Sequence, residues 1–349
     1  MNAVIDTEAR PMRVAPHPTH KFKLLLRREF WEHKGGFFWA PLVAGGIFLL
    51  LAVMGIGVGE MAKSRIPGDA RVNIEGGSFQ IDGLDLGHVG RQMSPHDLQE
   101  LGQGVDVALF MAGSWPLIVL AFVVFFYCLG ALYDERKDRS VLFWKSLPVS
   151  DRDTVLSKVA SAAVVAPALA IAASLATMFG FLVIMSLVVL AHGGNPLVLL
   201  WGPGSPLKIA AKLAATIPVY AVWALPTIGW LLLCSAWARS KPFLWAVLIP
   251  IFAGIFVSWF DLMQLFKLDS GWFWAHVTGR LLLSSVPGSD MFFRSSFEAS
   301  NDGFENVEQL LSLSNAYGAF LQPAMWIGAL AGAAMIYAAI RLRRWRDDN

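Results

Sequence analysis

Six long apolar segments constrain this chain more than any other feature, because a helix needs roughly 18 apolar residues to cross a lipid bilayer. They are the segments 37–58, 113–133, 157–189, 209–236, 242–262 and 321–340. Charged residues make up only 15% of the chain, whereas ordinary soluble domains have about 25%. The sequence therefore predicts an all-α, polytopic membrane protein with six transmembrane helices.

Charge alternates between the loops that join these segments. Basic residues collect before the first segment, between the second and third, between the fourth and fifth, and in the tail 341–349. The other loops differ: 59–112 has eight acids and four bases, 190–207 has no charged residue, and 266–320 has six acids and three bases. The positive-inside rule then places both termini in the cytoplasm. We expect the chain to lie in the inner (cytoplasmic) membrane.

The N-terminal region divides into two parts. Residues 1–20 are polar and contain three prolines, which is typical of a disordered tail. In 21–36, Phe22, Leu25 and Phe30 share one helical face, whereas bases including Arg28 lie elsewhere on the helix. This pattern predicts an amphipathic helix against the lipids of the cytoplasmic interface, with a simple extension of the first span as the alternative.

The extracytoplasmic loops carry their own patterns. Alternating residues around Gly76-Gly77 predict a β-hairpin, and Ser94-Pro95-His96-Asp97 predicts a helix start, so we expect 59–112 to form a small cap. We expect 190–207 to be a plain loop and 266–320 to contain a re-entrant or interfacial helix.

Prolines and glycines mark points inside the apolar segments. Four prolines are expected to kink the third, fourth and fifth spans: Pro167, Pro218, Pro226 and Pro250. Small residues recur at a spacing of four, which suits close helix packing. These residues are Gly55 with Gly59, and Ala324 with Gly328 and Gly332.

No catalytic or nucleotide-binding motif is evident. The chain has no Gly-Lys dipeptide, hence no Walker A loop, and its histidines have no metal-ligand spacing. We therefore expect no enzymatic activity, no cofactor or metal in this chain, and no nucleic-acid partner.

The cytoplasmic segment 134–150 combines charges with an apolar face. Ser140, Phe143, Trp144 and Leu147 follow helical spacing, and Pro148 ends the helix. Ser150 is then a predicted N-cap for the next helix. From the pattern alone, this helix either docks on a partner or lies on the membrane surface with its aromatic side chains among lipid headgroups.

The string "YDERKDRSVLFWKSLPVSDRDTVLSK" at 133–158 resembles the connection between spans two and three of ABC-2 type exporter permeases. The residues that carry this resemblance are Glu135, Arg136, Ser140, Leu142 to Leu147, Pro148, Val149, Ser150 and Lys158. The segment "RREFWEHK" at 27–34 is similar to the interfacial helix of that family. Arg139 departs from the pattern, because many members carry glycine there.

The resemblance implies a type-2 exporter fold in which 134–150 is a coupling helix. Phe143, Trp144 and Leu147 would anchor it in a separate ATPase subunit, and Glu135 with Arg136 would form the charged rim. Two such subunits would bind ATP and Mg²⁺, and a second permease chain, identical or related, would complete the pathway. The expected substrate is hydrophobic or amphipathic: a lipid, a peptide or an antibiotic.

Two other functions fit the apolar segments. One is a transporter or channel driven by an ion gradient, which the lack of acidic residues deep in the spans disfavours. The other is a membrane anchor or sensor whose cap, residues 59–112, binds a ligand.

Overall fold

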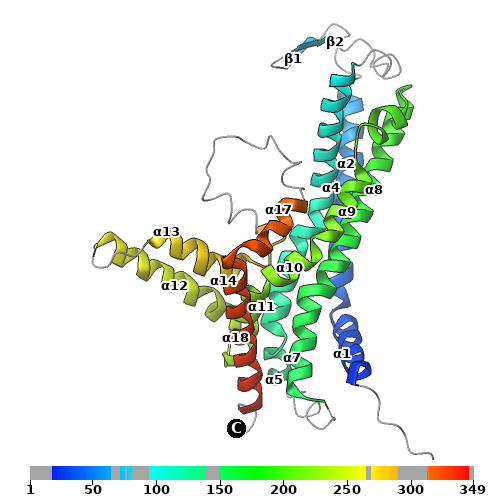
Figure 1. Cartoon of the computed structure of the whole chain (residues 1–349). Coiled ribbons are helices and arrows are strands. Elements are labelled where there is room, and N and C mark those ends of the chain that lie inside the picture. Colours follow the sequence, from blue (N-terminus) through cyan, green and yellow to red (C-terminus); the bar gives the residue numbers. More distant parts are fainter. Residues whose placement is uncertain are drawn as a thin grey trace, which may run out of the picture.

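The computed structural model describes residues 18–63, 71–74, 77–80, 94–138, 149–264, 269–289 and 313–345. Three long helical stretches run side by side and set the long axis of the molecule (Figure 1). Their main helices are α2 (Ala40–Lys63), α4 (Pro95–Gly130) and α8 (Ala166–Ala191). Shorter elements extend them at one end: η1 (Gly35–Trp39) before α2, α5 (Tyr133–Lys137) after α4, and α7 (Asp151–Ala160) with η2 (Ser161–Val165) before α8.

A second group of helices packs along this bundle. It comprises η3 (Leu197–Trp201), α9 (Pro206–Ala215), α10 (Ile217–Trp223), α11 (Leu225–Trp237) and α18 (Pro323–Trp345). The helical line is bent by 50° between α10 and α11, close to Pro226. This proline lies in the first turn of α11, where it needs no intrahelical hydrogen bond. The predicted kink in the fourth span is confirmed there.

Among the described residues, five helices are long and apolar enough to cross a membrane, and the bent pair gives a sixth candidate. The chain is thus a helical, multi-pass membrane protein, as the apolar segments predict. The helical stretches at spans two and three are longer than predicted: 43 residues over Pro95–Lys137 and 41 over Asp151–Ala191. At about 1.5 Å per residue, both exceed the roughly 30 Å of hydrocarbon and project beyond it.

α4 begins at Pro95, where the sequence predicts a helix start, and continues without a break into the second apolar segment, 113–133. Ser94 and Asp97 form the predicted capping box, with their side chains bonded to each other's backbone N–H groups at 3.2 and 2.9 Å. The hairpin is also present: β1 (Arg71–Ile74) pairs antiparallel with β2 (Gly77–Gln80). Gly77 lies in its second strand rather than in the turn.

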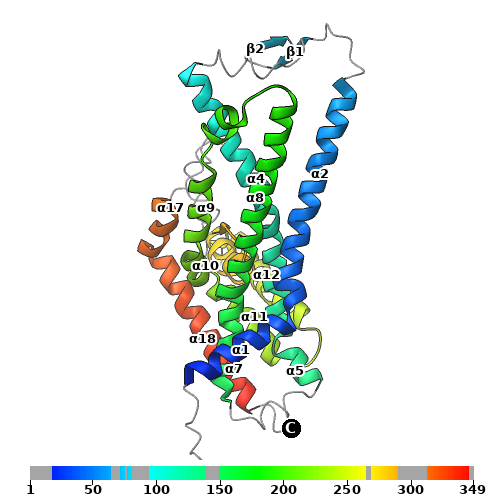
Figure 2. The same cartoon turned by 90° about the vertical axis from the view of Figure 1, so that its right-hand side faces the viewer.

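Four helical elements form an arm that projects to one side of the bundle instead of lying parallel to it (Figure 1). It contains α12 (Pro242–Leu262), α13 (Ser270–Phe273), η4 (Trp274–Gly279) and α14 (Arg280–Leu283). Although α12 is long enough to span a bilayer, it crosses the direction of α2, α4 and α8 and reaches away from the bundle (Figures 1 and 2). Hydrogen bonds from Thr278 to the Pro250 carbonyl at 3.2 Å and from Trp274 to Ser258 at 2.9 Å hold the arm together.

The closest helix packing joins α11 to α18 and depends on glycine. A Cβ on Gly229 would lie 2.5 Å from the carbonyl oxygen of Gly332, and one on Gly332 would lie 2.5 Å from that of Leu225. Gly55 and Gly59, in contrast, have no atom within 4 Å of such a Cβ. The small-residue pattern therefore predicts close packing correctly in the last span but not within this chain for the first.

Between the last two helical spans, the described chain also forms α17 (Leu313–Gly318) and η5 (Ala319–Leu321). The bundle core is apolar, with Leu120, Val124, Ile228 and Leu231 fully buried in its main cluster. α2 exposes a row of large apolar side chains, as a lipid-facing helix does. The predicted disordered tail 1–20 is wrong at its end, because α1 (Pro18–Glu32) begins at Pro18. Residues 1–17, most of the loop 59–93, and the segments 290–312 and 346–349 lie outside the described residues.

Candidate functional site

A buried cluster of charged side chains joins four elements at the end of the bundle where α1 (Pro18–Glu32) and the last turn of α18 meet. Its members are Arg28 and Glu29 of α1, Glu135 of α5, Asp151 and Lys158 of α7, and Arg343 of α18. We call these six residues the ionic cluster. They come from four regions spread from position 28 to position 343 of the sequence, so only the fold brings them together.

Lys158 lies at the centre of the ionic cluster. Its Nζ atom is 3.0 Å from a carboxylate oxygen of Glu29 and 3.0 Å from one of Glu135. The side chains of Lys158 and Glu29 are only 2% and 1% exposed, so the pairs are shielded from water and salt. The other Glu29 oxygen accepts a hydrogen bond of 2.8 Å from the Tyr127 hydroxyl of α4.

Glu135 connects Lys158 to the C-terminal helix. Its second carboxylate oxygen is 2.7 Å from Nη1 of Arg343, and Arg28 approaches its first oxygen at 3.5 Å. Arg343 also donates from Nε to Asp151 at 3.1 Å. A single carboxylate thus contacts α1, α7 and α18.

The ionic cluster holds three bases and three acids, so its formal charges balance. Buried charges cost several kcal/mol each in desolvation, and pairing only offsets that cost. Removal of one member leaves its partners charged and buried, at a cost of roughly 3–5 kcal/mol. The ionic cluster therefore fixes which helices meet, more than it adds net stability.

Beside the ionic cluster, Arg136 connects α5 to the end of α11. Its Nη2 atom donates to the carbonyl oxygens of Ser235 and Ala238 at 2.5 and 2.9 Å. The Ser235 hydroxyl in turn accepts from the backbone N–H groups of Leu132 and Tyr133 at 3.0 and 2.9 Å. The backbone N–H groups at the break between α4 and α5 thus find their hydrogen-bond acceptor on α11.

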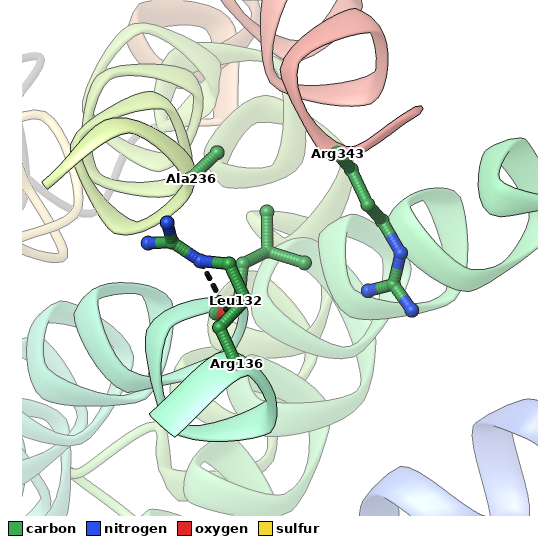
Figure 3. Close-up of a pocket in the computed structure, with 4 residues that line it drawn as sticks. All are labelled: Leu132, Arg136, Ala236 and Arg343. Atoms are coloured by element: carbon green, nitrogen blue, oxygen red, sulfur yellow. Dashed lines mark hydrogen bonds between the residues drawn. The ribbon is translucent and has the colours of Figure 1, made fainter. Parts of the chain in front are cut away.

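A small cavity lies where these contacts meet. It is lined by Leu132, Arg136, Ala236 and Arg343 (Figure 3). Figure 3 shows the Arg136 guanidinium turned toward Ala236 and that of Arg343 turned away from it. A volume of about 10 Å³ holds about one water molecule, so this cavity is too small for an organic ligand.

The structure brings together only some of the residues predicted to form sites. Glu135 is buried in the ionic cluster and Arg136 is bound to α11, so both make contacts inside the chain. The face of α1 that contains Leu25 packs against α7, with Leu25 buried and Phe22, Arg28 and Phe30 partly buried. The remaining predicted residues lie outside the described part of the chain: Ser140, Phe143, Trp144, Leu147 and Pro148.

Sequence reasoning missed Glu29 and Arg343. Glu29 lies four residues after Leu25, and an acid on the apolar face of a helix is a signal for a buried ion pair. Arg343 belongs to the basic tail of the sequence, and nothing local distinguishes it from Arg341 or Arg344. The predicted N-cap at Ser150 is confirmed by a 3.1 Å hydrogen bond from the Asp153 N–H group.

A second buried charge lies at the root of the arm. Arg280 places its guanidinium 3.5 Å from the centre of the Trp223 ring, and its side chain also contacts Gly328 of α18. The stacking is a cation–π contact in a low-dielectric setting. Within the described residues, no group of histidine, cysteine, aspartate or glutamate side chains could hold a metal ion.

Comparison of the chain with protein-family models, with curated proteins and with solved structures finds no match.

Proposed function

We propose that this chain is the transmembrane permease subunit of an ATP-binding-cassette exporter. A separate subunit would hydrolyse ATP, with Mg²⁺, and this chain would use the resulting motion to export a hydrophobic or amphipathic substrate such as a lipid, a peptide or an antibiotic. The proposal starts from the resemblance of 133–158 to the span-two-to-three connection of ABC-2 permeases.

The observation that supports the proposal most is that members of the ionic cluster lie on both sides of this connection in the sequence. Glu135 stands just before the segment 139–148, and Asp151 and Lys158 stand just after it. All three residues are paired with α1 or α18 or with each other. A force applied to 139–148 would therefore act on α4, α7, α1 and α18 together.

The length of the two helical stretches supports a role in transmitting motion. The helical stretch before the segment ends at Lys137, and the one after it begins at Asp151. Both continue without a long break to the opposite end of the bundle, at about 1.5 Å per residue. A displacement at the ATPase side would thus be carried across the membrane by two packed helices.

An ion-gradient mechanism has less support. Of the described residues, the buried carboxylates are Glu29 and Glu135, and both are paired with Lys158 at one end of the bundle. A proton or ion relay usually needs ionisable groups near the middle of the membrane. The arrangement favours a chain that receives energy from a partner.

The test is co-purification of an ATPase subunit with the tagged chain from its native membrane. We expect Phe143→Ala with Trp144→Ala to abolish co-elution and stimulated ATP hydrolysis, because aromatic anchors dominate such interfaces. Phe38→Ala with Trp39→Ala is the matched control, since this second Phe-Trp pair is exposed on η1. The proposal is wrong if the unmodified chain brings down no ATPase, or if both double variants behave alike.

A further inference from the structure

The outward face of α1 differs from the face that the sequence pattern favours. The apolar face with Leu25 turns inward onto α7, together with the buried Glu29. Leu24 and Trp31 therefore lie on the outside, 52% and 56% exposed. The surface of α1 that meets the surroundings is set by packing and not by the hydrophobic pattern.

Basic residues share this outward face. Arg27 and Lys34 follow Leu24 and Trp31 at helical spacing, and Lys23 lies at the edge of the same face. Lys34 places Nζ 4.9 Å from the centre of the Trp31 ring. We call Lys23, Leu24, Arg27, Trp31 and Lys34 the outer stripe.

Charge is sorted between the two sides of α1. The acids Glu29 and Glu32 are paired with Lys158 and Arg28. Among the described residues, no carboxylate lies within ion-pair distance of Lys23, Arg27 or Lys34. The outer stripe thus presents cations and apolar groups with no acid between them.

The position of the outer stripe next to the first candidate span indicates that it lies at the membrane surface. α1 ends three residues before Gly35, where the first candidate span begins, and Figure 2 shows α1 turned away from the direction of α2. A helix at that point lies at the boundary between hydrocarbon and water. Trp and Leu are favoured in that boundary, and Lys or Arg there attract anionic headgroups.

We propose that the outer stripe of α1 is a binding surface for anionic phospholipid. The headgroup phosphate would lie between Arg27 and Lys34, while Leu24 and Trp31 enter the acyl-chain boundary. This inference is independent of ATP-driven transport, because it requires only that the first span lies in a membrane.

The test uses the full chain in vesicles that contain spin-labelled phosphatidylglycerol or phosphatidylcholine. The measured quantity is the preference of the protein boundary for the anionic lipid. We expect Arg27→Gln with Lys34→Gln to lower that preference by about fivefold for each base removed. Arg239→Gln with Arg344→Gln removes the same charge from exposed residues outside α1 and should leave most of the preference.

A charge-preserving exchange, Arg27→Lys with Lys34→Arg, separates loss of the surface from misfolding and should keep the preference. An equal loss in the two double Gln variants would overturn the proposal, because the effect would then follow net charge. It would also be overturned if Arg27→Gln with Lys34→Gln kept the lipid preference but lost an ATPase subunit. That outcome would assign the outer stripe to a protein partner.

Discussion

At the residue scale, Lys158 is the central contact of the ionic cluster, which joins the ends of four helices. This lysine is 2% exposed, and its Nζ atom lies 3.0 Å from a carboxylate oxygen of Glu29 and 3.0 Å from one of Glu135, a pairing that offsets the desolvation cost of burial. The same residue is part of the sequence string that resembles the ABC-2 connection. In the structure it also has a clear internal role, in the pairing of α7 with α1 and α5.

We expect Lys158→Met to lower the free energy of unfolding by roughly 3–5 kcal/mol, because Glu29 and Glu135 are left buried beside an apolar side chain. Thermal unfolding can be followed with a thiol-reactive dye, since Cys128 and Cys234 are both free and buried until the chain opens.

The control for this variant is Lys208→Met, at an exposed position on α9, which should change stability by less than about 0.5 kcal/mol. Addition of Glu29→Gln to Lys158→Met should recover part of the loss, because one uncompensated charge is removed. If the Lys158 and Lys208 variants unfold at the same temperature, Lys158 does not form the buried ion pairs with Glu29 and Glu135.

At the scale of elements, the contact between α11 and α18 depends on the absence of side chains. The Cβ positions of Gly229 and Gly332 point at backbone carbonyls of the opposite helix, and backbone cannot rotate away as a side chain can. α18 also carries Arg343 into the ionic cluster. Close packing of these two helices therefore sets the position of a residue at the far end of α18.

We expect Gly332→Ala to destabilise the protein by roughly 1–3 kcal/mol, because the added methyl forces the backbones of α11 and α18 apart. Gly55→Ala is the matched control on α2, where no atom lies within 4 Å. It should be neutral or stabilise by about 0.5–1 kcal/mol, since alanine is the better helix former. Unfolding temperatures of the two variants in one detergent measure the difference, and equal temperatures would contradict the close approach.

At the scale of the whole molecule, α1 and the end of α18 share one end of the bundle, and the start of α4 and the hairpin lie at the other (Figure 1). The charge pattern of the loops predicts that the first end faces the cytoplasm. The arm projects sideways from the bundle between its two ends (Figure 1). The arrangement in space is therefore a bundle with one lateral projection rather than six parallel spans.

Cysteine substitution with a membrane-impermeant maleimide tests this arrangement in intact cells. We expect Glu100→Cys, exposed near the start of α4, to react from outside, and Arg344→Cys, exposed at the end of α18, to react only after permeabilisation. The sideways direction of α12 leads us to expect that its end lies within the bilayer, so Leu262→Cys, at the 78% exposed end of α12, should stay unreactive in the membrane. The native cysteines are buried and give little background.

The reverse pattern for Glu100→Cys and Arg344→Cys would show that the topology is the inverse of the predicted one. Reaction of Leu262→Cys from outside would show that α12 stands upright as a fifth span.

The sequence by itself determined the class of fold and many local features. Apolar length predicts membrane helices because hydrocarbon cannot satisfy exposed backbone groups. Local hydrogen bonding predicts the caps at Ser94 and Ser150, because those contacts lie within three residues along the chain. Proline chemistry likewise predicts the bend beside Pro226.

Which charges meet and which helix faces turn outward depends on long-range packing. Glu29, Glu135, Lys158 and Arg343 are far apart in sequence, and no local pattern shows that they converge. The inward face of α1 follows from its packing on α7, which turns Leu24 and Trp31 outward. The direction of α12 is also set by its contacts with η4 and α11, because a helix that is apolar all round has no intrinsic preference for one orientation.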